Sequence, residues 1–156
     1  EFPKRYGGNI RVFLSSGKTD MTHLNDRLNH DLNIEKTSVL RIYKFQERLT
    51  SWQSKIKTQL NKYNQEGLAV AGKAFPGRAS IIINSLGLDH NDLPVIFEQP
   101  TSPKVGHYVP GTKIPILAEK DLNEYDVLIN FAWHIDKEIS AYLKRQGFDG
   151  EVVPIL

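Results

Sequence analysis

The chain has 156 residues, and its hydrophobic share of 40% and charged share of 24% predict one ordinary globular domain. With 20 Lys and Arg against 18 Asp and Glu, the net charge of +2 gives no basis for a nucleic-acid partner. Cysteine is absent, which excludes disulfides and thiolate metal sites and is compatible with the reducing cytoplasm, where we expect the protein. No apolar run approaches the roughly 20 residues of a membrane span, so we expect no membrane partner.

The first 33 residues predict a strand followed by a linker. In residues 6–14, YGGNIRVFL, two glycines precede alternating apolar and polar positions, which is a strand pattern. A lone strand is unstable, so this one must join a sheet elsewhere. Residues 15–33 are polar and predict a linker with a short helix at most.

Residues 34–66 predict a long amphipathic helix, because they contain no Gly or Pro and their apolar residues recur at steps of three and four. The apolar positions are Val39, Ile42, Phe45, Leu49, Trp52, Ile56, Leu60 and Tyr63. Thr37 or Ser38 is a suitable N-cap, and Gly67 is a natural end.

From Gly67 onward, short apolar runs alternate with helical patterns. Strands are expected at residues 68–71, 94–97, 114–117, 126–131 and 151–156. Helices are expected at 78–86 and 134–146, with a short polar helix or turn at 119–124. This alternation predicts an α/β, Rossmann-like three-layer fold with a mostly parallel sheet, preceded by the long helix and the N-terminal strand.

In such folds, ligands bind beyond the carboxyl ends of the strands. Three unusual stretches fall there: GKAFPGR at 72–78, KVGHYVPGTKIP at 104–115 and AWH at 132–134. Because parallel strands all end at one edge of the sheet, we expect these loops to form one ligand site.

The GKAFPGR stretch is neither a dinucleotide fingerprint nor a P-loop. Gly72 and Gly77 still allow close approach of the backbone to a ligand, and a helix from Arg78 presents N–H groups to an anion. Lys73 and Arg78 add positive charge. We therefore expect a phosphate or nucleotide contact here; the alternative is a plain strand-to-helix turn with solvated basic residues.

The KVGHYVPGT stretch crowds polar groups into nine residues. Lys104 can pair with a phosphate, His107 and Tyr108 can hydrogen-bond or stack, and Thr112 adds a hydroxyl. The alternative is a structured loop with Tyr108 in the core.

The AWHIDKE stretch supplies the candidate catalytic pair, His134 and Glu138. Four residues apart on a helix, they project from one face and can act as an acid/base or orienting pair. Local hydrogen bonding of His134 at a helix start is an equal alternative. The helix has no second histidine, so no metal site is predicted.

Taken in order, YGGNIRVF, GKAFPGR, KVGHYVPGTKIPI and NFAWHIDKEI resemble the C-terminal part of sugar C-methyltransferases. These S-adenosylmethionine-dependent enzymes methylate a carbon of a nucleotide-linked keto-sugar. The family usually has His where Tyr6 stands and often Asn where His134 stands, departures that weaken a role for either residue.

The resemblance implies that residues 1–33 are the tail of a methyltransferase domain and that residues 34–156 form the Rossmann-like C-terminal domain. It implies that S-adenosylmethionine is bound by the upstream domain, that zinc lies in an N-terminal module, and that neither site is in this chain. The partners it implies are the upstream domain and a nucleotide-sugar.

We therefore expect a substrate-binding portion of a C-methyltransferase, inactive alone. The expected substrate contacts are Lys73, Arg78, Lys104, His107, Tyr108 and Thr112. The alternative is a non-catalytic small-molecule or protein interaction module of Rossmann-like fold, in which the long helix pairs between chains.

Overall fold

The computed structural model describes residues 16–17 and 22–156, so the strand predicted at residues 6–14 lies outside the described residues. The residues divide into two compact units, and the boundary falls between Trp52 and Gln53, within a long helix. The second unit contains the sheet.

Two helices dominate the first unit: α1 (Thr22–Lys36) and the first part of α2 (Ser38–Gln65). Helix α2 confirms the predicted amphipathic helix, and Gly67 follows it with a φ of 72°. Helix α1 has 15 residues, longer than the short helix expected in the linker. Its Asn, Asp and His residues have low helix propensity, so the sequence pattern under-predicted the length of this helix, although no Gly or Pro interrupts it.

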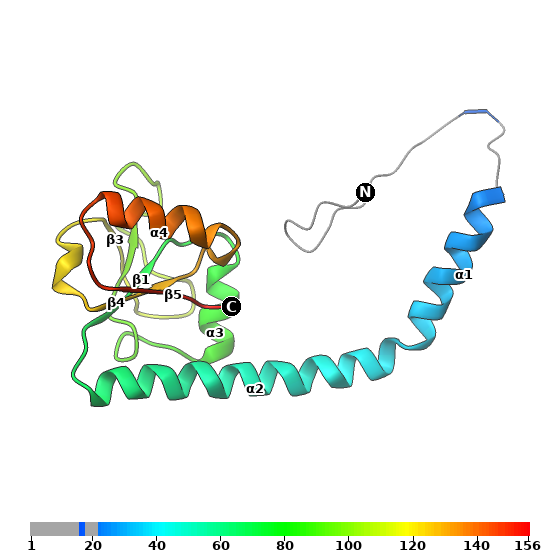
Figure 1. Ribbon diagram of the computed structural model, residues 1–156, viewed down its shortest axis with the longest axis horizontal. Coiled ribbons are helices and arrows are strands. Elements are labelled where there is room, and N and C mark those ends of the chain that lie inside the picture. The colour runs from blue at the N-terminus through cyan, green and yellow to red at the C-terminus, as the bar shows by residue number, and fades with distance from the viewer. Residues whose placement is uncertain (1–15, 18–21) are drawn as a thin grey trace. The chain divides into compact units, whose positions relative to one another are not determined.

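The sheet has five strands, all parallel, in the order β3-β2-β1-β4-β5 (Figure 1). The strands are β1 (Val70–Lys73), β2 (Ile96–Glu98), β3 (Ile116–Ala118), β4 (Val127–Asn130) and β5 (Glu151–Pro154). Every residue of the two central strands, β1 and β4, is buried, as expected for a parallel sheet covered on both faces. The predicted α/β, Rossmann-like class is confirmed.

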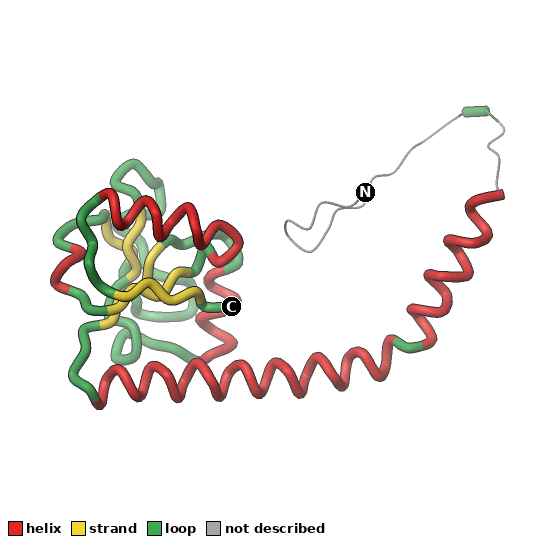
Figure 2. The backbone as a smooth tube through the Cα atoms, viewed as in Figure 1, coloured by secondary structure: helices red, strands yellow, loops and turns green. Residues whose placement is uncertain are grey.

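Helix α4 (Asp136–Arg145) covers one face of the sheet (Figure 2). On that face Leu143 belongs to a buried cluster with Phe97, Leu128 and Phe148. Helix α3 (Ala79–Leu86) and the C-terminal part of α2 cover the other face. Two short 3-10 helices, η2 (Leu122–Glu124) and η3 (Trp133–Ile135), precede β4 and α4 respectively. The result is three layers.

Contacts on the α2 side show how closely the layers approach. Ile56 and Leu60 of α2 line a small cavity together with Ile129 of β4, and the Gln53 side-chain amide donates to the Ser85 carbonyl at 2.6 Å. The tightest approach is within the sheet. A Cβ at Gly72 would lie 2.7 Å from Cγ1 of Ile96, so only glycine fits there.

None of the helices in the described part of the chain combines the length and the apolar character that crossing a membrane requires.

Candidate functional site at the carboxyl edge of the sheet

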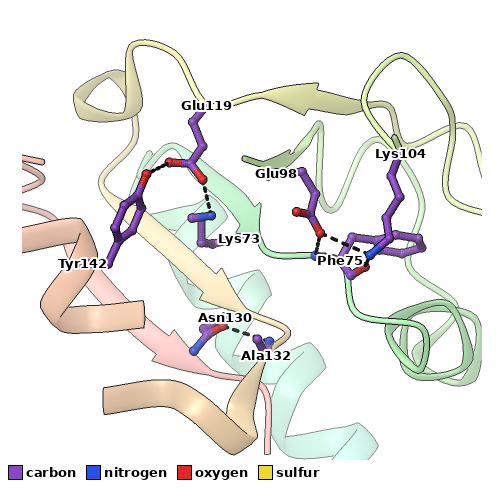
Figure 3. A network of polar contacts seen from close by, with 8 residues as sticks. All are labelled: Lys73, Phe75, Glu98, Lys104, Glu119, Asn130, Ala132 and Tyr142. Carbon is purple, nitrogen blue, oxygen red and sulfur yellow. Dashed lines mark hydrogen bonds and ion pairs between the residues drawn. The ribbon is translucent and has the colours of Figure 1, made fainter. Parts of the chain in front are cut away.

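The loops after β1 and β2 are held together by charged side chains (Figure 3). The Glu98 carboxylate, at the end of β2, accepts a hydrogen bond of 2.6 Å from the Phe75 N–H. The Lys104 ammonium lies 3.6 Å from that carboxylate and also donates to the Phe75 carbonyl. The Lys104 side chain is 41% exposed, so it still faces solvent. The structure therefore places Lys104 beside the β1–α3 loop that the sequence singled out.

The residue between β1 and this loop has a strained backbone. Ala74 has a φ of 63°, in the left-handed region that non-glycine residues rarely adopt. Such conformations cost about 1–3 kcal/mol and persist only where the surroundings enforce them. Here the Ala74 N–H donates to the Phe97 carbonyl at 2.9 Å, and Glu98 holds the next N–H, that of Phe75. The carboxyl edge thus maintains a fixed, strained turn.

Lys73, a predicted substrate contact, is 2% exposed and forms an ion pair inside the protein. Its ammonium donates to Oε1 of Glu119 at 2.6 Å, and the Tyr142 hydroxyl donates to Oε2 of the same carboxylate at 2.6 Å. The hydrogen bond to Glu119 raises the pKa of Tyr142 to about 12, because ionisation would place a second negative charge beside the carboxylate. Figure 3 shows the three side chains converging from β1, the loop after β3, and α4.

Asn130, which is not among the site residues predicted from the sequence, fixes the loop between β4 and α4. It is fully buried at the end of β4; its side-chain oxygen accepts the Ala132 N–H at 2.9 Å and its amide donates to Asp136 at 2.8 Å. These two bonds fix the turn from β4 into α4. The available signal was a polar residue inside the apolar run DVLINF.

The candidate pair His134 and Glu138 lies on two successive elements. His134 belongs to η3, where its ring packs edge-on against the Trp133 ring with 5.7 Å between the ring centroids. Glu138 lies in the first turn of α4. The sequence predicted one helix from His134, whereas α4 begins at Asp136. An acid/base role for the pair stays a prediction.

Residues 106–116 form a hairpin that leads into β3. The Val109 N–H donates to the Ile114 carbonyl at 2.9 Å, and Tyr108 bridges Pro115 in antiparallel fashion. The Asn84 amide donates to the Pro110 carbonyl at 2.9 Å and so attaches the tip of the hairpin to α3.

The hairpin separates residues that the sequence grouped together. Tyr108 is 63% exposed, so it is not the core residue of the alternative interpretation, and His107 is also exposed. The Thr112 hydroxyl donates to the Val109 carbonyl at 3.0 Å and accepts the Ile114 N–H at 3.1 Å, within the turn itself. Because the hairpin tip precedes β3, it lies towards the amino end of that strand, away from Lys104.

Arg78 is exposed and directly precedes α3. It follows Phe75, to which Lys104 is bonded, by three residues, so these two predicted contacts belong to the same edge. The substrate roles of Arg78, Lys104 and the other selected residues stay predictions.

A cavity of about 530 Å³ lies beside this edge, between residues 119–124 and the end of α4. Its lining includes the carboxylates of Glu119, Asp121 and Glu124 but a single cation, Lys120. This excess of negative charge disfavours a phosphate-bearing ligand. Across the described ranges, no three His, Asp or Glu side chains cluster closely enough to hold a metal ion.

Comparison with known proteins identifies the family. No curated protein matches the chain. The family model described as the C-methyltransferase C-terminal domain matches residues 4–154, nearly the whole sequence, and confirms the resemblance stated from the motifs. The chain belongs to the C-methyltransferase C-terminal domain family.

Proposed function

We propose that this chain is the substrate-binding portion of an S-adenosylmethionine-dependent C-methyltransferase that acts on a nucleotide-linked keto-sugar. Family membership supports methyl transfer to carbon as the reaction of the whole enzyme. It also favours this function over a stand-alone interaction module. We assign the chemistry to the methyltransferase portion and expect the chain alone to be inactive.

The residues of this chain do not fit S-adenosylmethionine. The β1–α3 loop lacks the glycine fingerprint of a dinucleotide site. The acidic residue at the end of β2, which in such sites binds a ribose hydroxyl, is Glu98, and here it is already engaged with the Phe75 N–H and Lys104. Without cysteine, the chain also offers no thiolate for zinc. Both groups therefore belong, in this proposal, to other parts of the enzyme.

One observation carries the proposal: two cations, Lys104 and Arg78, lie on one edge beside the rigid β1–α3 turn, where Glu98 supplies one carboxylate. Lys104 is oriented by the Phe75 carbonyl and by Glu98, so its charge is held in place before a ligand arrives. A diphosphate carries the complementary charge, and a preorganised cation binds it with little loss of side-chain entropy. The domain would then contribute to catalysis by positioning the sugar against the methyltransferase portion.

Titration calorimetry tests this proposal. We expect a nucleoside diphosphate (TDP, UDP or GDP) to bind the chain, and the Arg78→Ala, Lys104→Ala variant to bind it at least about tenfold more weakly, or about 1.4 kcal/mol. The control is Lys113→Ala, which removes an exposed cation from the hairpin tip and should leave affinity unchanged. Equal affinity of the double variant and the unmodified chain would refute the proposal.

A further inference from the structure

The apolar stripe of α2 is covered along only part of its length. Leu60 and Tyr63, near the C-terminal end of the helix, are 8% and 4% exposed. Ile42 and Phe45, near the other end, are 62% and 60% exposed. The stripe is continuous in spacing, yet no described residue covers its first part. An apolar face of this kind marks a contact surface.

A row of basic residues runs beside the stripe. It recurs at seven-residue intervals, so its members lie above one another along the helix. The row consists of Arg41, Arg48, Lys55 and Lys62. In the whole of α2 the only acidic residue is Glu47, against six basic ones, the row together with Lys44 and Lys57. Lys62, at the covered end, pairs with Glu66 at 3.8 Å. A surface that covers the exposed end of the stripe must therefore place its rim against Arg41 and Arg48, and carboxylates are the complementary groups.

The same spacing argues against a second copy of the chain as the partner. With Ile42 and Phe45 at heptad positions a and d, the basic row occupies g, and the e positions include Gln46 and Gln53. In a parallel pair each cation would face a glutamine, and in an antiparallel pair each would face another cation. Neither pairing forms an ion pair.

The exposed part is also too short for an intermolecular coiled coil. Of the stripe, Ile42 and Phe45 are exposed while Leu49 and Trp52 are half-buried, so the exposed part covers less than one heptad, whereas about three to four are needed for a coiled-coil pattern. A short contact is sufficient when the partner is tethered, because the effective concentration of a linked surface is high. This favours a partner within the same enzyme.

We propose that the first half of α2, through Ile42 and Phe45 with Arg41 and Arg48 at the rim, docks on an apolar ridge flanked by Asp and Glu. The ridge belongs to the methyltransferase portion of the enzyme, an identity that rests on the proposed function. The chemistry of the ridge rests on α2 alone.

A first experiment tests that chemistry on the 156-residue chain. Fluorescence anisotropy compares two synthetic helical peptides with Leu at a and d, one with Glu and one with Lys at e and g. We expect the Glu peptide to bind at least about tenfold tighter at low salt, with the difference shrinking as salt rises. The variant Arg41→Glu, Arg48→Glu should reverse the preference, and the charge-matched control Lys113→Glu, Lys120→Glu should not.

Three results would overturn the inference. Equal binding of both peptides, or of neither, would show that the basic row does not select its partner. Self-association that Phe45→Asp abolishes would make the second copy the occupant. Binding to phosphatidylserine-containing vesicles in place of the Glu peptide would make the surface a membrane contact.

A second experiment locates the ridge in the intact enzyme. The chain lacks cysteine, so Phe45→Cys introduces one site-specific label. We expect its alkylation, followed by mass spectrometry, to be at least about tenfold slower in the enzyme than in the 156-residue chain. Glu47→Cys, on the opposite face of α2, should react equally in both. Equal rates at Phe45→Cys would exclude docking there, whereas failure of nucleotide binding alone would refute only the proposed function.

Discussion

At the scale of single residues, the most consequential feature is the buried charge of Lys73. Sequence reasoning treated Lys73 as a free cation in a glycine-rich turn, because its counter-charge lies 46 residues later, at Glu119. No sequence pattern near Lys73 or Glu119 indicates that the two residues pair. It arises only when β3 takes its place in the sheet and α4 brings Tyr142 to the same carboxylate.

The ion pair predicts an asymmetric response to mutation. Glu119→Gln leaves the ammonium of Lys73 buried without its counter-charge, so we expect a loss of about 3 kcal/mol in the free energy of unfolding. The double variant Lys73→Met, Glu119→Gln should be more stable than Glu119→Gln alone, because it removes the uncompensated charge. Urea denaturation measures both.

The control for this prediction is Asp121→Asn. Asp121 pairs with Lys120 at 3.6 Å, but both side chains are exposed, at 57% and 83%, so the change should cost less than about 1 kcal/mol. If Glu119→Gln cost no more than this surface substitution, the buried pair would have no special energetic weight.

At the scale of elements, the stretch KVGHYVPGTKIP is a hairpin and not an open loop. Its glycines and prolines indicated turns, but antiparallel pairing within a segment so interrupted has no period from which to predict it. Val109 and Ile114 become buried, while Tyr108 remains exposed. The polar residues that looked like one cluster are therefore distributed along the hairpin.

Gly111 is the residue on which the hairpin tip depends. Its φ is 82°, and a Cβ there would lie 2.5 Å from Oδ1 of Asn84, the side chain that binds the Pro110 carbonyl. We expect Gly111→Ala to lower the free energy of unfolding by at least about 1–2 kcal/mol, from the left-handed backbone alone.

The contrasting substitution is Gly77→Ala, since Gly77 has neither a positive φ nor an atom within 4 Å of an added Cβ. Calorimetric unfolding should show little change for Gly77→Ala. Adding Asn84→Ala to Gly111→Ala would separate the steric clash from the backbone cost. Equal stability of the two glycine variants would contradict this role of Gly111.

Long periodic elements could be predicted and short polar ones could not. The C-terminal part of the α2 stripe and the apolar runs of β1 and β4 are buried, and burial leaves a regular pattern in the sequence. Asp26 and residues 28–36 of α1 are all exposed, so burial gives no signal from which to predict the length of this part of the helix. Buried polar residues such as Asn130 are required by hydrogen bonds made in the folded protein, and in the sequence they are visible only as a break in an apolar run.

At the scale of the whole molecule, the alternation of strands and helices was enough to predict the Rossmann-like class. It was not enough to separate residues that face a ligand from those that hold the edge together. Lys104 and Glu98 hold the edge together, since both are hydrogen-bonded to the Phe75 backbone. The motifs indicated the family, which the comparison then confirmed.

The proposed function requires the carboxyl edge of this sheet to bind the nucleotide part of the nucleotide-linked keto-sugar. The most direct measurement is amide NMR of the ¹⁵N-labelled chain during titration with TDP, UDP or GDP. We expect shifts concentrated in residues 74–78, 99–104 and 132–134, which form that edge. Shifts confined to the hairpin tip at 110–113 or to the acidic cavity at 119–124, or no shifts with any of the three nucleotides, would contradict it.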